Sequence, residues 1–480
     1  MSRVIQKASI YAVAFILVIA LGVDVFYILY NAEWLIGDDA FMLRHTAFGL
    51  PFLPSESILP EDGFFRPFNY IHENLVLLFH SGMHDAFEHY IINAVSFLLC
   101  IGAVIGTLWL TIKPKKVIDY AIIVFGTILV ASRIIGIYIN IYGPIFNVYT
   151  YHALAILFLT IFMKNDKVWS MLLSLFFWGC SMLVYENVCM VVGCMGLFPL
   201  LFAYKRLNRR QIMYCFTLLG FVIAFAAAYL LIIYLPSSGQ TTYDPTHGTG
   251  LSIIDNAKQI LLGQKFIWVA AIVWGWRQIQ LAAMKSDYHI LYDTLLWAAG
   301  GMVFGGIVLR LNWTMYYYDA IIVSLPAVVY FLKKVHDNYG RYITFGVVTL
   351  FACWHSYNLP RTFANNQKDR IDTAKNMESI VEKAANGWSV IWCENGELDG
   401  FDNVLREWKK ETTQSYMQYL LQDKEWSYDQ VERAGNAVVF YAKENDIAGD
   451  IPDSLVNYER IPIGVTSGMS YFIIDKTKEE

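Results

Sequence analysis

Two adjacent carboxylates, Asp38 and Asp39, follow closely on the first long apolar stretch of the sequence. Neighbouring side chains of an extended or turn-like segment diverge, so one carboxylate can face a cavity while the other is held elsewhere. Coupling between the two groups raises the proton affinity of the site. Such a pair can act as a general base that takes the proton of an attacking hydroxyl group. It can equally cap a short helix over residues 40–44 and interact with the helix dipole, and the pair alone leaves both roles open.

Long apolar stretches surround this pair and must position it. Of the 480 residues, 56% are hydrophobic and only 16% are charged, which is far less charge than a soluble protein carries. Crossing about 30 Å of hydrocarbon takes roughly 20 residues of helix. The sequence therefore predicts a polytopic all-α membrane body over residues 1–358 with about eleven transmembrane helices. These are expected near residues 8–30, 90–112, 117–139, 148–163, 168–185, 188–204, 212–235, 264–284, 290–310, 315–332 and 342–358.

Basic residues set the predicted orientation of the spans. Clusters such as those at 113–116 and 205–210 fall in every second connection, as the excess of Lys and Arg in cytoplasmic loops requires. The N-terminus is therefore expected in the cytoplasm. With an odd number of spans, the first connection 31–89, a mobile loop at 236–263 and the segment 359–480 are expected on the extracytoplasmic side.

The segment 359–480 is expected to form a small extracytoplasmic α/β domain. It carries 14 Lys and Arg against 22 Asp and Glu, whereas the first 358 residues have a small basic excess. Residues 364–385 and 401–422 have helical composition, and 388–393, 437–441 and 469–474 have strand composition. No basic face is concentrated in this domain, so nucleic acid is not expected as a partner.

Ionisable residues fall near the outer ends of the predicted helices. Placing such a group at membrane depth costs roughly 2.5 to 3.5 kcal/mol on insertion scales, so its position is informative. Each one alone fits a structural ion pair as well as a functional role. Their common side indicates a site that faces outward, whereas Arg277, toward the cytoplasmic end of its span, fits an orientation anchor. The outward set is Asp24, Arg133, His152, Glu186, Arg310 and Asp319.

The arrangement of motifs in residues 1–100 resembles a known family. A first apolar helix is followed by Asp38-Asp39, a long amphipathic loop with Arg66-Pro67, and then His89-x-x-x-Asn93 at the start of the second helix. This order resembles the GT-C superfamily of membrane glycosyltransferases that use polyprenyl-phosphate sugars. Within that superfamily the chain looks most like the bacterial O-antigen glucosyltransferases of the serotype-converting type.

The resemblance implies an inverting hexosyltransferase in the bacterial inner membrane. It would move a hexose such as glucose from a polyprenyl-phosphate carrier, undecaprenyl phosphate for example, to a polysaccharide or lipid-linked glycan such as the O-antigen of lipopolysaccharide. Asp38 or Asp39 would be the general base. The donor phosphate would be bound by Arg310, Arg66 and Arg133, because one guanidinium group can donate hydrogen bonds to two phosphate oxygens at once. Sugar or acceptor contacts are expected from Glu186, Tyr185, His89, Asn93, Trp313 and Tyr317.

Purely structural roles for the aromatic and turn residues also remain open. The run at 313–318 also fits an aromatic belt at the membrane interface. Glu186 also fits a turn residue that is simply exposed to water. His80 and His84 have a metal-ligand spacing, but a third convergent ligand with supporting hydrogen bonds is not evident, so neither a metal nor another cofactor is expected.

A transporter or flippase for a lipid-linked sugar is the main alternative function. Outward-facing arginines and aromatic rings would suit such a protein equally well. Many transporters are built from two repeated halves with broken helices at matching positions. The sequence shows no such repeat, and this favours the transferase.

Overall fold

The computed structural model falls into two compact units, formed by residues 1–28, 52–72 and 92–357 and by residues 29–51, 73–91 and 358–480. Within them it describes residues 3–30, 53–60, 64–71, 74–75, 87–139, 143–237, 252–263, 265–283, 286–308 and 318–336, and the short stretches 383, 388–392, 436–442, 458–463 and 469–475.

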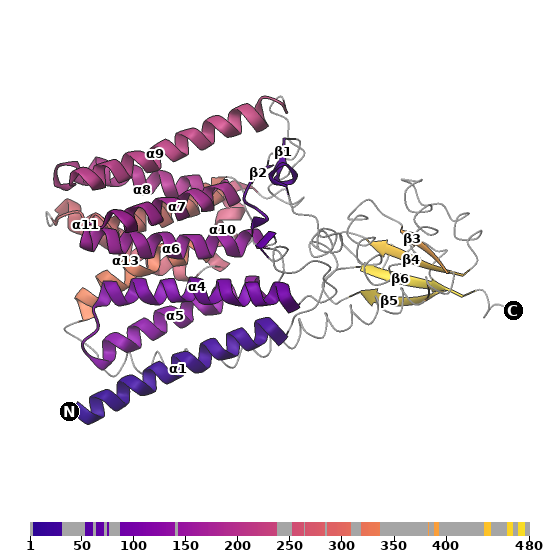
Figure 1. Cartoon of the computed structure of the whole chain (residues 1–480), viewed down its shortest axis with the longest axis horizontal. Coiled ribbons are helices and arrows are strands. Elements are labelled where there is room, and N and C mark those ends of the chain that lie inside the picture. Colours follow the sequence, from indigo (N-terminus) through magenta and orange to yellow (C-terminus); the bar gives the residue numbers. More distant parts are fainter. Residues whose placement is uncertain are drawn as a thin grey trace. The chain divides into compact units, whose positions relative to one another are not determined.

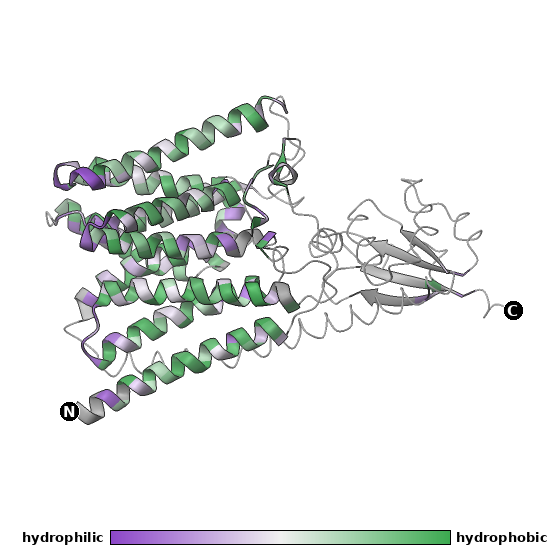
Figure 2. Cartoon of the chain, in the orientation of Figure 1, coloured by the Kyte–Doolittle hydropathy of each residue, from purple (hydrophilic) through white to green (hydrophobic). Residues whose placement is uncertain are grey.

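The first unit is dominated by long helices that run side by side (Figure 1). Apolar residues cover most of their length and hydrophilic residues gather at their ends, as expected of helices that cross a bilayer (Figure 2). The helices are α1 (Arg3–Tyr30), α4 (Phe87–Ile112), α5 (Val117–Tyr138), α6 (Gly143–Asn165), α7 (Val168–Val184), α8 (Val188–Ala203), α9 (Arg209–Tyr229), α10 (Ile253–Gly263), α11 (Lys265–Ala283), α12 (Tyr292–Val308) and α13 (Tyr318–His336).

Every span expected up to residue 332 coincides with a helix. By length and composition, five segments of the described residues can cross a membrane on their own, and α7 and α12 are shorter apolar helices. The chain is therefore a multi-pass membrane protein, while the count of eleven spans stays a prediction. The last expected span, 342–358, lies outside the described residues. The five segments are Ile10–Tyr30, Tyr90–Ile112, Val117–Tyr138, Val188–Arg206 and Arg209–Tyr234.

Local signals explain where two of these helices begin. The side chain of Asn208 accepts a hydrogen bond from the Gln211 N–H at 2.9 Å, and the Gln211 side-chain oxygen accepts one from the Asn208 N–H at 3.0 Å, which caps α9. In the first turn of α5, the Asp119 carboxylate accepts the backbone N–H groups of Lys115 and Lys116. Lys333 of α13 lies 3.3 Å from the same carboxylate and joins α13 to this helix start.

A buried ion pair links α11 to α12. Arg277 donates to both oxygens of Asp293, at 2.9 and 2.7 Å, and its guanidinium carbon lies 4.4 Å from the centre of the Phe331 ring on α13. Arg277 is only 6% exposed and Asp293 only 1%. Arg277, which fitted an orientation anchor by sequence, is thus a buried contact between three helices.

The second unit contains a four-stranded sheet with the order β3-β4-β6-β5. Its strands are β3 (Ser389–Trp392), β4 (Ala437–Ala442), β5 (Glu459–Ile463) and β6 (Met469–Ile474). β3 and β4 pair in parallel, and the other pairs are antiparallel. The three expected strands are present, and β5 is additional. The helices expected at 364–385 and 401–422 fall almost entirely outside the described residues.

Candidate functional site

The described residues include only part of the predicted site. Asp38, Asp39, Arg310, Trp313 and Tyr317 lie outside them, as do the histidines at 72, 80 and 84. The backbone of His89 belongs to α4, but its side chain also lies outside the description. Of the remaining predicted residues, Arg66, Tyr185 and Glu186 come together in space, and Asn93 and Arg133 lie on α4 and α5.

Arg66 and Glu186 form an ion pair that joins the first loop to the turn between α7 and α8. The Arg66 Nε atom lies 3.0 and 3.1 Å from the two carboxylate oxygens of Glu186. The Phe65 N–H donates to the same carboxylate at 3.0 Å. The side chains are 11% and 22% exposed, so the pair is largely shielded from water. This shielding makes its attraction stronger than that of a surface pair.

Aromatic rings hold the Arg66 guanidinium in place. Its central carbon lies 4.0 Å from the Phe64 ring centre and 4.6 Å from that of Tyr185. Attraction between a cation and ring faces at such distances is worth about 0.5 to 2 kcal/mol. The Phe68 N–H also donates to the Leu183 carbonyl at 3.0 Å, at the end of α7. The loop that carries Arg66 is therefore attached to the α7–α8 turn by several independent contacts.

Asn93 takes part in a different network, between α4, α5 and α6. Its amide donates to the Tyr138 carbonyl at 3.1 Å, and the Tyr138 hydroxyl lies 2.9 Å from the Thr150 hydroxyl. Thr150 in turn donates to the Ser96 carbonyl at 3.3 Å. Asn93 is only 3% exposed. These contacts tie the start of α4 to its neighbours, while Arg133 is a partly exposed residue of α5.

Two of the outward ionisable residues meet inside the bundle. His152 Nδ1 on α6 lies 3.2 Å from Asp319 Oδ1 in the first turn of α13. Neither side chain is more than 5% exposed, and the Trp178 ring packs 5.1 Å from the His152 ring. Asp24 is also fully buried, within α1.

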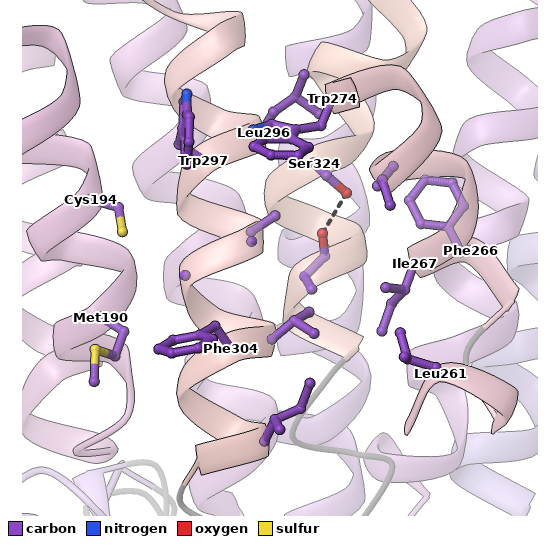
Figure 3. A pocket seen from close by; sticks show the side chains of 18 of the residues that line it. Met190, Cys194, Leu261, Phe266, Ile267, Trp274, Leu296, Trp297, Phe304 and Ser324 are labelled. Carbon is purple, nitrogen blue, oxygen red and sulfur yellow. Dashed lines mark hydrogen bonds between the residues drawn. The ribbon is translucent and has the colours of Figure 1, made fainter. Parts of the chain in front are cut away.

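An apolar cavity of about 600 Å³ lies between α8, α10, α11, α12 and α13 (Figure 3). Its walls are almost entirely hydrocarbon, and its lining side chains carry few heteroatoms: the sulfurs of Met190 and Cys194, the Ser324 hydroxyl and the indole nitrogens of Trp274 and Trp297. Sequence reasoning missed it, because five helices contribute to it. Gly300 and Gly301 on α12 both line it. The volume falls within the roughly 300 to 1,000 Å³ of ligand pockets.

The cavity follows α12 toward the C-terminal end of that helix. Its lining residues on α12 run from Leu296 to Ile307, and Ile307 precedes Arg310 by three residues in the chain. An apolar volume of this size suits a hydrocarbon chain. Within the described residues, no group of three or more His, Cys, Asp or Glu side chains is arranged to hold a metal ion.

Comparison with known proteins relates the chain to solved membrane proteins by fold. No family model and no curated protein sequence matches it. The structure of ArnT from Cupriavidus metallidurans in the apo state matches with a TM-score of 0.55 and 11% sequence identity, over 98% of each chain. ArnT bound to undecaprenyl phosphate matches at 0.49 and 10%, over 96% of this chain and 97% of that one. An oligosaccharyltransferase from Archaeoglobus fulgidus, in complex with zinc and sulfate, matches at 0.45 and 14%, over 82% and 61%. The apo ArnT likeness shows that this chain has an ArnT-like fold along nearly its whole length.

Proposed function

We propose that the chain is a membrane glycosyltransferase of the GT-C type that moves a hexose from a polyprenyl-phosphate carrier to a surface polysaccharide or lipid-linked glycan. The observation that carries the proposal is the ArnT-like fold over 98% of both chains. The structure of ArnT from Cupriavidus metallidurans has also been solved with undecaprenyl phosphate bound. A lipid carrier gives a reason for a transferase to be built within the membrane.

The apolar cavity supports a donor with a long hydrocarbon tail. It lies among the membrane helices, and its α12 wall ends three residues before Arg310. A tail in the cavity would leave the phosphate near Arg310, whose guanidinium can bind two phosphate oxygens at once. Arg133 is a second candidate for this contact. Arg66 is already engaged by Glu186, so it fits better as a residue that positions the first loop than as the main phosphate ligand.

The proposed reaction is a single displacement at the anomeric carbon of the donor sugar. Asp38 or Asp39 takes the proton of the acceptor hydroxyl while its oxygen bonds to the anomeric carbon. The bond between that carbon and the carrier phosphate oxygen breaks, and its electron pair stays on the phosphate. Arginine side chains stabilise the charge that remains there. Attack from the opposite side inverts the configuration of the sugar.

The proposal is tested with the full-length protein in proteoliposomes and a panel of undecaprenyl-phosphate sugars. Wild type is expected to transfer one of the sugars to an added glycan acceptor. Loss of the base should lower the rate roughly 100- to 10,000-fold in Asp38→Asn or in Asp39→Asn. Asp287→Asn is the matched control, because the Asp287 side chain is 92% exposed and pairs only with Arg206 in the described residues.

Two results would contradict parts of the proposal. Full transfer by both Asp38→Asn and Asp39→Asn would show that neither residue is the base. Movement of a lipid-linked sugar across the bilayer, without any glycosidic bond formed, would identify a transporter instead.

A further inference from the structure

Phe198, Trp274 and Trp297 form an aromatic wall that lines one end of the apolar cavity. The Trp297 ring stacks on Phe198 with centroids 4.4 Å apart and meets the edge of Trp274 at 5.0 Å and 90°. Phe202 lies behind, 6.2 Å from Trp297 and nearly parallel to it. Figure 3 shows the two tryptophans together at one end of the cavity. Three helices therefore interlock at this wall.

The Arg277–Asp293 ion pair lies about one helical turn from the wall along both α11 and α12. Arg277 follows Trp274 by three residues on α11, and Asp293 precedes Trp297 by four on α12. Side chains at these spacings share a helix face, about one turn of 5.4 Å apart. A hydrocarbon chain pushed past the wall would meet charged groups whose hydrogen bonds it cannot replace, which is costly. Entry of a hydrocarbon chain beyond the aromatic wall is therefore unfavourable.

The side of the cavity opens toward the apolar surface of the bundle. Phe304 of α12 and Met190 of α8 line the cavity and are 66% and 45% exposed. A chain that does not fit has a lateral exit between these residues. Because the bilayer is as apolar as the cavity, burial alone gives a tail little reason to enter. Shape and length therefore decide how much of a tail the cavity takes.

We propose that the aromatic wall is the stop that sets how deeply the isoprenoid tail of the donor enters, with Trp297 as the residue that determines this length. The inference rests on the proposed function, since it takes the occupant to be a polyprenyl phosphate. From Trp297 to Ile307 the cavity follows ten residues of α12, which is about 15 Å at 1.5 Å per residue. A longer tail has to turn back at the wall and leave through the opening at Phe304, which lies seven residues of α12, or about 10 Å, from Trp297.

Photo-crosslinking with geranyl, farnesyl and geranylgeranyl phosphate, each carrying a diazirine at the end of the tail, tests the stop. In the wild type, the probe that fills the cavity is expected to label Trp274 or Trp297. A longer probe should label Met190 or Phe304 and no residue behind the wall. Excess undecaprenyl phosphate should remove the labelling.

Truncation of a tryptophan in the aromatic wall should shift the site of photo-crosslinking. In Trp297→Ala the same probes are expected to reach about one helical turn further, to Phe202 or the residues next to Asp293. Trp274→Ala is a second variant for the same shift, with gel filtration to verify folding. Trp276→Ala is the matched control for Trp274→Ala. Trp276 also lies on α11, but it is 46% exposed and does not line the cavity.

The outcomes separate this inference from the proposed function. Labelling that is unchanged in Trp297→Ala and Trp274→Ala, or that never reaches the wall in wild type, overturns the stop even if sugar transfer occurs. Labelling that shifts as described in a protein that transfers no sugar supports the stop and overturns the transferase.

Discussion

At the scale of single residues, the contact between Arg66 and Glu186 changes what each of them can do. From the sequence alone, Arg66 is expected to bind phosphate and Glu186 to bind sugar, and no sequence pattern indicates that the two residues are in contact. They are 120 positions apart, and local spacing carries no information on such a contact. In the structure each is the partner of the other, and the pair also holds the Phe65 backbone. We infer that the pair holds residues 64–66 of the first loop against the turn between α7 and α8.

Removal of the Glu186 carboxylate tests this positioning. Glu186→Ala is expected to lower the free energy of unfolding by about 1.5 to 3 kcal/mol, because it deletes hydrogen bonds between charged groups in a shielded place. Glu186→Gln should lose less, since its amide oxygen can still accept the Phe65 N–H. Both are measured by denaturation in mixed micelles.

An exposed ion pair of the same chain provides the control for Glu186. Arg210 and Asp166 lie 3.0 Å apart, but each side chain is 49% exposed. Asp166→Asn should therefore change the stability by less than about 1 kcal/mol. Equal effects of Glu186→Ala and Asp166→Asn would refute a special role for the Arg66–Glu186 pair.

Part of the predicted site lies within the described residues. Arg66 contacts both Glu186 and Tyr185 there. The two aspartates, Arg310, Trp313 and Tyr317 lie outside the described residues, and the roles of all these residues stay predictions. The apolar cavity was not predictable from any single motif, since residues with no chemistry of their own line it.

At the scale of elements, hydropathy predicted the helices well and the small elements poorly. Apolar stretches of the right length correspond to helices up to residue 332. α10 was hidden within the expected mobile loop at 236–263, because an amphipathic helix of 11 residues gives a weak apolar signal. β5 was missed because Pro462 argues against a strand, yet β5 is an edge strand, where proline is tolerated.

The packing of α8 on α12 depends on a glycine with no room for a side chain. A Cβ atom at Gly301 would lie 2.5 Å from the Cys194 sulfur, whereas one at Gly300 would meet nothing within 4 Å. We expect Gly301→Ala to cost about 1 to 3 kcal/mol of stability through overpacking, and Gly300→Ala to be nearly neutral. Thermal unfolding of both variants measures the difference.

A second substitution locates the clash at Gly301. The next atoms near that Cβ position are 3.7 Å or more away, so replacing the sulfur should relieve the contact. Cys194→Ala is therefore expected to restore most of the stability that Gly301→Ala loses. No recovery in the double variant would show that the two helices approach each other differently.

The His152–Asp319 pair joins α6 to the start of α13. Removing one partner leaves a polar group buried without compensation, so His152→Ala and Asp319→Ala should each destabilise the bundle. The double variant is expected to lose less than the sum, with a coupling of about 1 to 3 kcal/mol. Unfolding of the four proteins in mixed micelles measures this cycle, and purely additive losses would mean that the two side chains do not interact.

At the scale of the whole molecule, the fold class could be predicted from the sequence. The function, in contrast, is a proposal that rests on one reaction. Composition and the spacing of basic clusters predicted a multi-pass helical body, and the ArnT-like fold agrees with it. Fold alone leaves the chemistry open, because one architecture can serve several reactions. The cavity depends on how five helices pack, and the sequence does not specify that packing locally.

A single-turnover experiment tests the central claim most directly. The protein in proteoliposomes is loaded with an undecaprenyl-phosphate hexose carrying a radiolabel in the sugar, and acceptor glycan is then added. Wild type should pass the label to the acceptor with inverted anomeric configuration. Asp38→Asn or Asp39→Asn should keep the donor bound and transfer its sugar roughly 100- to 10,000-fold more slowly. Transfer at the wild-type rate by both variants would contradict the account.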